Sequence, residues 1–163
     1  MTDPKAEAAL AEAVAKAAGL PRAFAVHADP AAPPSAEQEP LPAALQRKPV
    51  AEKSAAEWAY ERIILYIRNF ESQLDASQEI ALGFAGSDAG VLKIEGLGFF
   101  EPDLITFYGR DENGMKTQLI QHVAQLSVML RAVLKSEPAE PPTRIGFRLA
   151  SGWTGGESGD GSV

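Results

Sequence analysis

The sequence predicts an α+β domain with the element order α-β-β-β-α-β, in which four strands form a mostly antiparallel sheet and two helices pack on one of its faces. Two observations support this prediction. Segments whose apolar residues alternate, as in a strand, stand between segments whose apolar residues recur with the helical period. Short turns join the strand-like segments, which favours antiparallel neighbours. A flexible N-terminal arm and a flexible C-terminal tail are expected outside this domain.

The domain is expected to begin near Glu52, and its first helix is expected to follow an N-cap at Ser54 and to run to about Leu74. Ser54 and Glu57 have the spacing of a capping box, in which each side chain accepts a hydrogen bond from the backbone N–H of the other residue. Within the second predicted strand, Gly96 and Gly98 interrupt the alternation and indicate a bulge or a bend. The first three strands are expected at residues 79–84, 91–100 and 104–109.

A second helix is predicted for residues 118–134. The Asn113-Gly114 pair that precedes it is a strong turn signal, because both residues tolerate positive φ. One broad face of this helix would carry Leu119, Ile120, Val123, Leu126, Leu130, Val133 and Leu134. Beyond a proline-rich connector, residues 144–149 alternate again and predict the last strand.

The two ends of the chain have compositions that differ from that of the domain. Residues 1–20 are rich in alanine and predict a weak helix. Residues 21–51 form a proline- and alanine-rich stretch that is expected to be a disordered linker, since it cannot bury enough apolar surface to order itself. Residues 151–163 form a Gly/Ser-rich tail that is expected to be disordered. The folded domain is therefore predicted at residues 52–150.

Charge and composition argue against several classes of protein. The 163 residues carry a formal net charge of −7, which disfavours a nucleic-acid binder because phosphate contacts need a clustered basic surface. The sequence has no cysteine, so it offers no disulfide framework and no thiolate site. It also has no apolar run long enough to cross a bilayer. We expect a cytoplasmic protein with no membrane insertion.

No catalytic residue, metal site or cofactor is predicted from the motifs. The glycine-rich segment at residues 83–90 precedes a strand and is expected to be a hairpin turn, because a phosphate cradle would lead into a helix. His122 has no second ligand at helical spacing, so a metal site there is not indicated.

Two surfaces of the predicted helices are candidates for binding an unknown protein partner or a second copy of the chain. The first is an uncharged stripe on the second helix, formed by Gln118, Gln121, His122 and Gln125. Amide side chains both donate and accept hydrogen bonds, although a plain solvated face is the alternative. The second is a ridge on the first helix, formed by Trp58 and Leu65. This ridge is either covered by a tail or loop, or exposed as a contact surface.

A third candidate surface is the open face of the sheet, where Lys93, Glu95, Tyr108, Arg144 and Arg148 are expected. An antiparallel sheet commonly has one solvated face. The alternative is a site for a small ligand or a substrate, which would require a pocket that joins these groups. The leading prediction is a non-enzymatic interaction or adaptor domain that self-associates, and the alternative is a small-molecule-binding protein or an enzyme.

Several short segments between Trp58 and Leu149 resemble an uncharacterised bacterial family of unknown function that is frequent in alphaproteobacteria. The resemblance extends over roughly residues 52–150, and Gln118-Leu119-Ile120-Gln121-His122-Val123 is its most specific part. Its other carriers are Tyr60-Glu61-Arg62, Phe70-Glu71, Ile94-Glu95-Gly96-Leu97-Gly98-Phe99, Pro102-Asp103-Leu104-Ile105-Thr106-Phe107-Tyr108-Gly109 and Arg144-Ile145-Gly146-Phe147-Arg148. The resemblance implies the domain boundaries and a bacterial origin, and it implies no activity.

Overall fold

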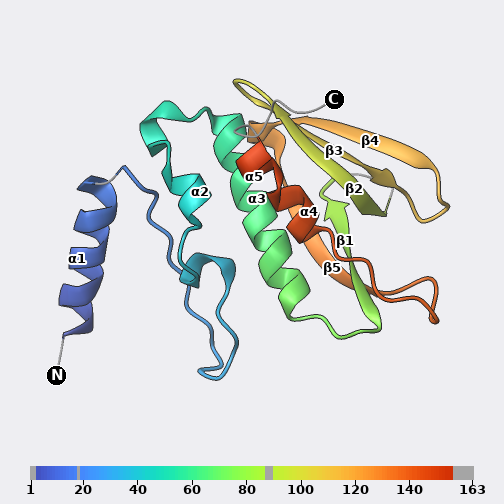
Figure 1. Ribbon diagram of the computed structural model, residues 1–163, viewed down its shortest axis with the longest axis horizontal. Coiled ribbons are helices and arrows are strands. Elements are labelled where there is room, and N and C mark those ends of the chain that lie inside the picture. Colours follow the sequence, from blue (N-terminus) through green and yellow to red (C-terminus); the bar gives the residue numbers. More distant parts are fainter. Residues whose placement is uncertain (1–2, 18, 87–89, 156–163) are drawn as a thin grey trace. The chain divides into compact units, whose positions relative to one another are not determined.

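The computed structural model describes residues 3–17, 19–86 and 90–155, and the chain divides into two compact units, Met1–Lys53 and Ser54–Val163. Figure 1 shows the elements of each unit. Residues 87–89 of the predicted hairpin turn and residues 156–163 of the predicted tail lie outside the described residues. None of the helices in the described ranges has both the length and the apolar character needed to span a bilayer.

The first unit consists of short helical elements joined by extended chain. Its elements are α1 (Pro4–Ala17), the 3-10 turn η1 (Ala36–Gln38), α2 (Ala43–Gln46) and the 3-10 turn η2 (Val50–Glu52). The proline-rich stretch therefore carries short ordered turns. Val50 donates a backbone hydrogen bond to Gly19 O at 2.8 Å, and Lys53 Nζ donates to Leu45 O at 2.8 Å. The first of these bonds joins the two ends of the stretch.

The second unit is an α+β domain with an antiparallel sheet, as predicted, but the sheet has five strands instead of four. Its elements are α3 (Ala55–Ser72), β1 (Gln78–Phe84), β2 (Val91–Phe100), β3 (Leu104–Arg110), β4 (Lys116–His122), η3 (Val123–Gln125), β5 (Val128–Leu134), α4 (Gly146–Ala150) and α5 (Gly152–Gly155). Ser54 caps α3, because its Oγ accepts from the N–H of Glu57 at 3.1 Å. In β2 the register shifts between Ile94 and Gly96.

The helix predicted for residues 118–134 is absent, so this prediction is wrong. The strands β4 and β5 occupy the segment, and the turn η3 separates them. The apolar residues of β4, η3 and β5 have a helix-like spacing when they are counted as one segment. The reason is that the turn interrupts the two-residue alternation of the strands. Pairing with strands distant in the sequence decides the outcome: β4 pairs with β3, and β5 pairs with β1. Such tertiary contacts override the local periodicity.

The strand predicted for residues 144–149 is also wrong, because Gly146–Ala150 form the helix α4. The carboxylate of Glu71 accepts hydrogen bonds from the N–H groups of Ile145 at 2.8 Å and Gly146 at 2.7 Å. These groups open a helix and need acceptors outside it. The two helices expected on one sheet face are therefore reduced to α3, with α4 packed beside α3 (Figure 1).

The sheet forks between β1 and β2. These strands pair only at Leu82 with Leu92 and at Gly83 with Val91, whereas β1 pairs with β5 along its whole length. The strand order is β4-β3-β2-β1-β5. The β1–β5 ribbon and the three-stranded part therefore share one end and diverge from it, which opens a space between them.

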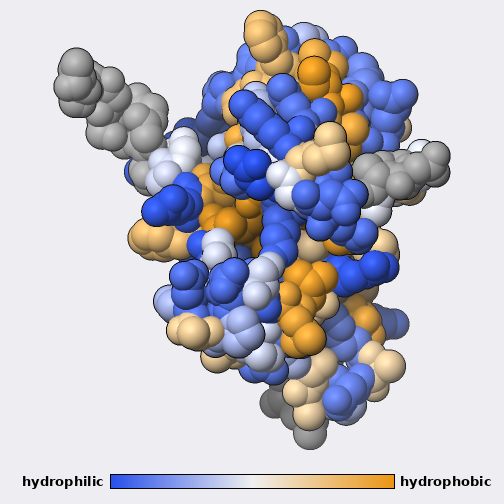
Figure 2. Space-filling view, turned by 90° about the vertical axis from the view of Figure 1, so that its right-hand side faces the viewer, coloured by the Kyte–Doolittle hydropathy of each residue, from blue (hydrophilic) through white to orange (hydrophobic). Residues whose placement is uncertain are grey.

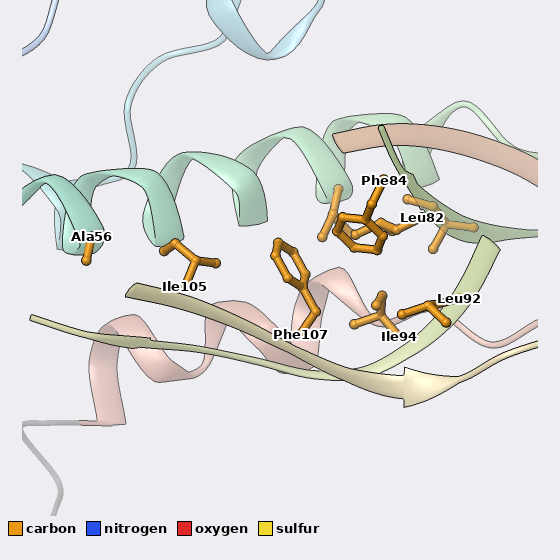
Figure 3. Packing of buried hydrophobic residues seen from close by; sticks show 9 residues of the cluster. Ala56, Leu82, Phe84, Leu92, Ile94, Ile105 and Phe107 are labelled. Carbon is orange, nitrogen blue, oxygen red and sulfur yellow. The ribbon is translucent and has the colours of Figure 1, made fainter. Parts of the chain in front are cut away.

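The hydrophobic core lies between α3 and the sheet. Figure 3 shows side chains from both layers pointing toward one another. The rings of Phe84 and Phe107 meet edge to face, with centroids 4.7 Å apart. The buried cluster consists of Ala56, Ile67, Ile80, Leu82, Phe84, Leu92, Ile94, Ile105 and Phe107. Because successive strand residues point to opposite faces, their neighbours in the sequence, such as Glu79 and Lys93, lie on the face turned away from α3.

Candidate functional site

A cleft of about 620 Å³ lies where β1 and β2 diverge. Residues from β1, β2 and β5 form its floor, including the apolar side chains of Ala81, Val91 and Val133. The β3–β4 turn contributes one wall, and the segment from β5 to α4, residues 135–145, contributes the other. We call this segment the connector. The volume is within the usual range for small-ligand sites, which span roughly 300–1,000 Å³.

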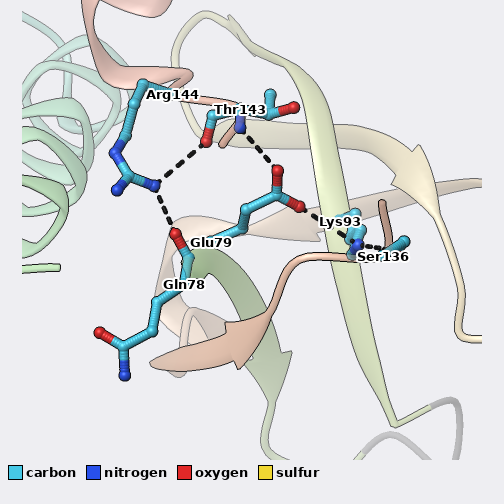
Figure 4. Close-up of polar contacts among 6 residues, drawn as sticks. All are labelled: Gln78, Glu79, Lys93, Ser136, Thr143 and Arg144. Carbon is cyan, nitrogen blue, oxygen red and sulfur yellow. Dashed lines mark hydrogen bonds and ion pairs between the residues drawn. The ribbon is translucent and has the colours of Figure 1, made fainter. Parts of the chain in front are cut away.

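The connector is held against the start of β1 by Arg144. Its Nη1 donates to Gln78 O at 2.6 Å, and its Nη2 donates to Asp75 O at 2.9 Å. Figure 4 shows the guanidinium reaching from the connector to the strand. Hydrogen bonds from a guanidinium to backbone carbonyls fix geometry, since both partners are rigid. Arg144 therefore builds the wall of the cleft instead of lining it, and this was not predicted from the sequence.

Glu71 is a second anchor of the connector. Glu71 is only 7% exposed, and its two carboxylate oxygens accept hydrogen bonds from the N–H groups of Ile145 and Gly146. A Cβ on Gly146 would lie 2.6 Å from Arg68 Cγ and 2.9 Å from Glu71 Oε1. The close approach of the first residue of α4 to α3 therefore requires glycine at this position.

Glu79 and Lys93 form the polar centre of the cleft. Lys93 Nζ lies 3.4 Å from Glu79 Oε1 and 2.7 Å from Ser136 Oγ, while Glu79 Oε2 accepts from Thr143 N–H at 2.6 Å. The Glu79 side chain is 12% exposed. Burial alone would raise the pKa of Glu79, but the Thr143 hydrogen bond and the Lys93 ammonium outweigh it and hold that pKa below its usual value. Figure 4 shows these contacts joining β1, β2 and the connector.

The residues that line the cleft have an excess of negative charge. The acidic members are Glu79, Glu95, Asp111, Glu112, Glu137 and Glu140, and the basic members are Lys93 and Arg110. Two positive charges against six negative charges leave a formal charge of −4. Each basic group also faces a carboxylate, Lys93 at Glu79 and Arg110 at Glu95, both at 3.4 Å. The cleft therefore favours a positively charged occupant.

The contact between Lys93 and Ser136 has the composition of a serine–lysine catalytic pair. Lys93 Nζ also contacts Glu79 Oε1 at 3.4 Å, so Ser136 is one of two partners of this amine. Within the described ranges, no group of three or more His, Cys, Asp or Glu side chains could hold a metal ion. We assign no reaction to this pair.

The structure brings together only part of the predicted open-face site. Lys93 and Glu95 line the cleft as neighbours on β2. Tyr108 lies elsewhere on the open face, with its ring over Gly96, whose added Cβ would be 3.4 Å from the ring. Arg148 is on α4 and is exposed. Sequence reasoning missed Glu79 and Arg110 as cleft residues, although the alternation of the strands places both on the face of Lys93.

The predicted Gln/His helix face is wrong as a face, because its residues lie on a strand and a turn. Gln118 and His122 point to the exposed side of β4, whereas Gln121 points to the opposite side, and Gln125 lies in η3. His122 Nε2 contacts Asp103 Oδ2 at 3.1 Å, and His122 Nδ1 accepts from Ala124 N–H at 3.0 Å. The four side chains therefore do not form one stripe.

The predicted Trp58/Leu65 ridge is not an exposed surface at Trp58. This residue is 6% exposed, and the guanidinium carbon of Arg62 lies 5.6 Å from the centroid of its ring. Leu65 is half-buried.

Comparisons with known proteins identify a family and nothing more specific. A search of curated proteins and a search of solved structures gave no match. A family model described as "Family of unknown function (DUF6173)" matches residues 48–148, which include α3 and all five strands. The matched region includes the strands and the whole connector that form the cleft. The chain therefore belongs to this family of unknown function.

Proposed function

We propose that the domain binds a small organic cation in the cleft. The observation that carries this proposal is a cleft of about 620 Å³ whose floor is partly apolar and whose lining has a formal charge of −4. Binding sites for small molecules combine apolar walls with a few convergent polar groups. Figure 2 shows hydrophobic patches bordered by hydrophilic side chains on the face of the molecule that it presents.

The distribution of groups within the cleft favours an amine with an aliphatic body. Ala81, Val91 and Val133 offer apolar contacts to methylene groups. Glu137 and Glu140 on the connector offer carboxylates to an ammonium or a guanidinium. An anionic ligand would meet this negative lining, and it would have to separate Lys93 and Arg110 from their carboxylate partners.

Titration calorimetry on the full chain tests this proposal. Spermidine is the probe, and a neutral polyol of similar length is the matched control. We expect saturable heat with spermidine, none with the polyol, and affinity that falls as salt rises.

Glu137→Gln with Glu140→Gln should weaken spermidine binding by about tenfold, or about 1.4 kcal/mol. Glu101→Gln, an exposed carboxylate in the β2–β3 turn outside the cleft, is the control variant. Absence of saturable binding, or equal effects of the two sets of variants, would contradict the proposal.

A protein-interaction role is the second candidate, as expected from the sequence. The observation that favours it is a set of exposed apolar side chains, including Phe100 at 75% and Ile120 at 59%. Affinity purification from the native cell with full-length protein tests it. Phe100→Ser and Ile120→Ser should each lose the recovered partner, and retention of the partner by both would count against this surface. The cytoplasmic compartment and the bacterial origin stay predictions.

A further inference from the structure

The strand β4 ends the sheet on one side. It pairs with β3 over Leu104–His122 to Arg110–Lys116, and no other described strand pairs with it. The edge strand of an open sheet presents backbone N–H and C=O groups that no neighbour satisfies. Such an edge can therefore form backbone hydrogen bonds with another strand.

The hydrogen bonds at both ends of the β3–β4 ladder show which groups point outward. Val123 N–H donates to Asp103 O at 2.8 Å, and Asp111 N–H donates to Met115 O at 3.0 Å. In an antiparallel pair, hydrogen-bonded and non-hydrogen-bonded positions alternate. The ladder therefore uses the backbone of Leu119 and its alternate neighbours, and the N–H and C=O groups of Gln118 and Ile120 point away from β3.

The side chains along this edge do not protect it. Between Lys116 and His122 the strand reads Thr-Gln-Leu-Ile-Gln, without charge or proline. Proteins usually blunt an edge with charged residues, proline or a bulge. Ile120 is 59% exposed on the open face of the sheet. The edge is thus uncharged and straight in register, with an exposed β-branched residue at its outward position.

We infer that β4 pairs antiparallel with β4 of a second copy, so that the two sheets become continuous across a two-fold axis at Leu119. This inference is independent of the cleft and names a partner for the interaction role. In this register Gln118 faces Ile120 of the partner subunit, and each satisfies the outward N–H and C=O of the other. Ile120 also lies diagonally beside Ile120 of the partner subunit, within reach of side-chain contact.

Charge complementarity supports this register. Lys116 at one end of β4 faces His122 of the partner subunit at the other end. His122 is already paired with Asp103, with Nε2 and Oδ2 3.1 Å apart. The Lys116 ammonium therefore faces a pair that includes the Asp103 carboxylate. His122 N–H is occupied by Gln125 Oε1 at 3.4 Å, while its carbonyl can accept from Lys116.

Other registers fit less well. A slip of one residue would place the ladder-facing groups of Leu119 opposite the outward groups of the second copy, and no bonds would form. A slip of two residues keeps bonding but places Lys116 opposite Ile120 or Ala124 of the partner subunit, depending on its direction, and in both cases away from the His122–Asp103 pair. The symmetric register at Leu119 is the one that satisfies both the backbone and the charges.

The test measures the oligomeric state of the full chain by sedimentation velocity across the micromolar to millimolar range. Wild type should show a dimer that dissociates on dilution. Gln118→Pro removes one outward N–H without removing a bond to β3, so the fold should survive and the dimer dissociation constant should rise by at least about a hundredfold. Gln118→Ala keeps the N–H and should change the constant by no more than about threefold.

Two further measurements test the β4–β4 dimer if Gln118→Pro fails to fold. Lys116→Glu should weaken the dimer by about tenfold, and adding Asp103→Lys should restore most of the loss. Hydrogen exchange of the Ile120 amide should slow as the concentration rises. A monomer at every concentration overturns the inference. So does a dimer that a folded Gln118→Pro leaves intact, or an Ile120 amide that exchanges equally fast at all concentrations.

Discussion

The two edge strands of the sheet, β4 and β5, have the same length of seven residues but meet different surroundings. The strand β5 carries the charged Arg131 in its middle and leads directly into the connector, which forms a wall of the cleft. The strand β4 has an uncharged middle and ends in the turn η3. One edge region is thus built into a pocket, while the other stays available for pairing.

The cleft side and the β4 side of the sheet are stabilised in different ways. The cleft side depends on polar contacts between segments far apart in the sequence, above all those of Glu71 with the end of the connector and of Arg144 with Gln78. The β4 side depends on its backbone ladder with β3. Substitutions at polar side chains should therefore affect the cleft side, whereas the β4 side should respond mainly to changes of the backbone.

The largest effect is expected from Gly109→Ala in β3. An added Cβ would overlap with the carbonyl oxygen of Lys93, and backbone atoms cannot move aside cheaply. We expect a loss of about 3 kcal/mol or more in the free energy of unfolding. Gly83→Ala in β1 is the matched control, because its nearest atom is the flexible end of Met129 at 3.1 Å, and about 1 kcal/mol is expected. Urea denaturation compares them, and equal losses would contradict the account.

A smaller but still large effect is expected at Glu71. Glu71→Ala leaves the N–H groups of Ile145 and Gly146 without their acceptors in a buried site, which should cost about 2–4 kcal/mol. Glu71→Gln keeps one side-chain acceptor oxygen and should cost less. Denaturant titration measures the difference, and spermidine affinity should fall with Glu71→Ala because the connector loses its anchor. A loss of stability without any change in spermidine affinity would contradict the role of the connector as a wall of the binding site.

The stability of the cleft side should depend on pH through Glu79. Its pKa is lower in the folded protein than in the unfolded chain, so its contribution is present above the unfolded value of about 4.3 and is lost as pH falls below it. Glu79→Gln should therefore flatten the decline in the free energy of unfolding as pH falls below this unfolded value and through the lower folded pKa. Glu101→Gln is the control and should leave the slope of wild type. An unchanged slope in Glu79→Gln would show that the pair with Lys93 has no energetic role.

The smallest effect is expected from Arg110→Ala. Its pair with Glu95 is 3.4 Å long, and the two side chains are 53% and 56% exposed. Exposed ion pairs contribute little, so the free energy of unfolding should change by no more than about 0.5 kcal/mol. The substitution also removes a positive charge from the cleft, and spermidine should bind slightly tighter. Weaker binding would contradict the charge argument for the cleft.

The sequence predicted the first half of the domain better than the second. Ser54 and the apolar face after it identify α3, and local alternation identifies β1 to β3, because these signals lie within each segment. The segment from Gln118 to Leu134 misleads, since its spacing suits a helix and only pairing with β3 and β1 makes it two strands. The cleft was only partly predictable for the same reason. Lys93 and Glu95 stand out in the sequence, but their joining with Glu79 depends on β5 and the connector.

The most direct test of the cleft as a binding site is a map of backbone amide chemical shifts of the full chain during titration with spermidine. We predict changes that saturate together at cleft residues such as Ala81, Lys93 and Thr143, while the amides of β4 stay unchanged. Saturating changes centred on β4 or on α3, or no saturating changes at all, would contradict it.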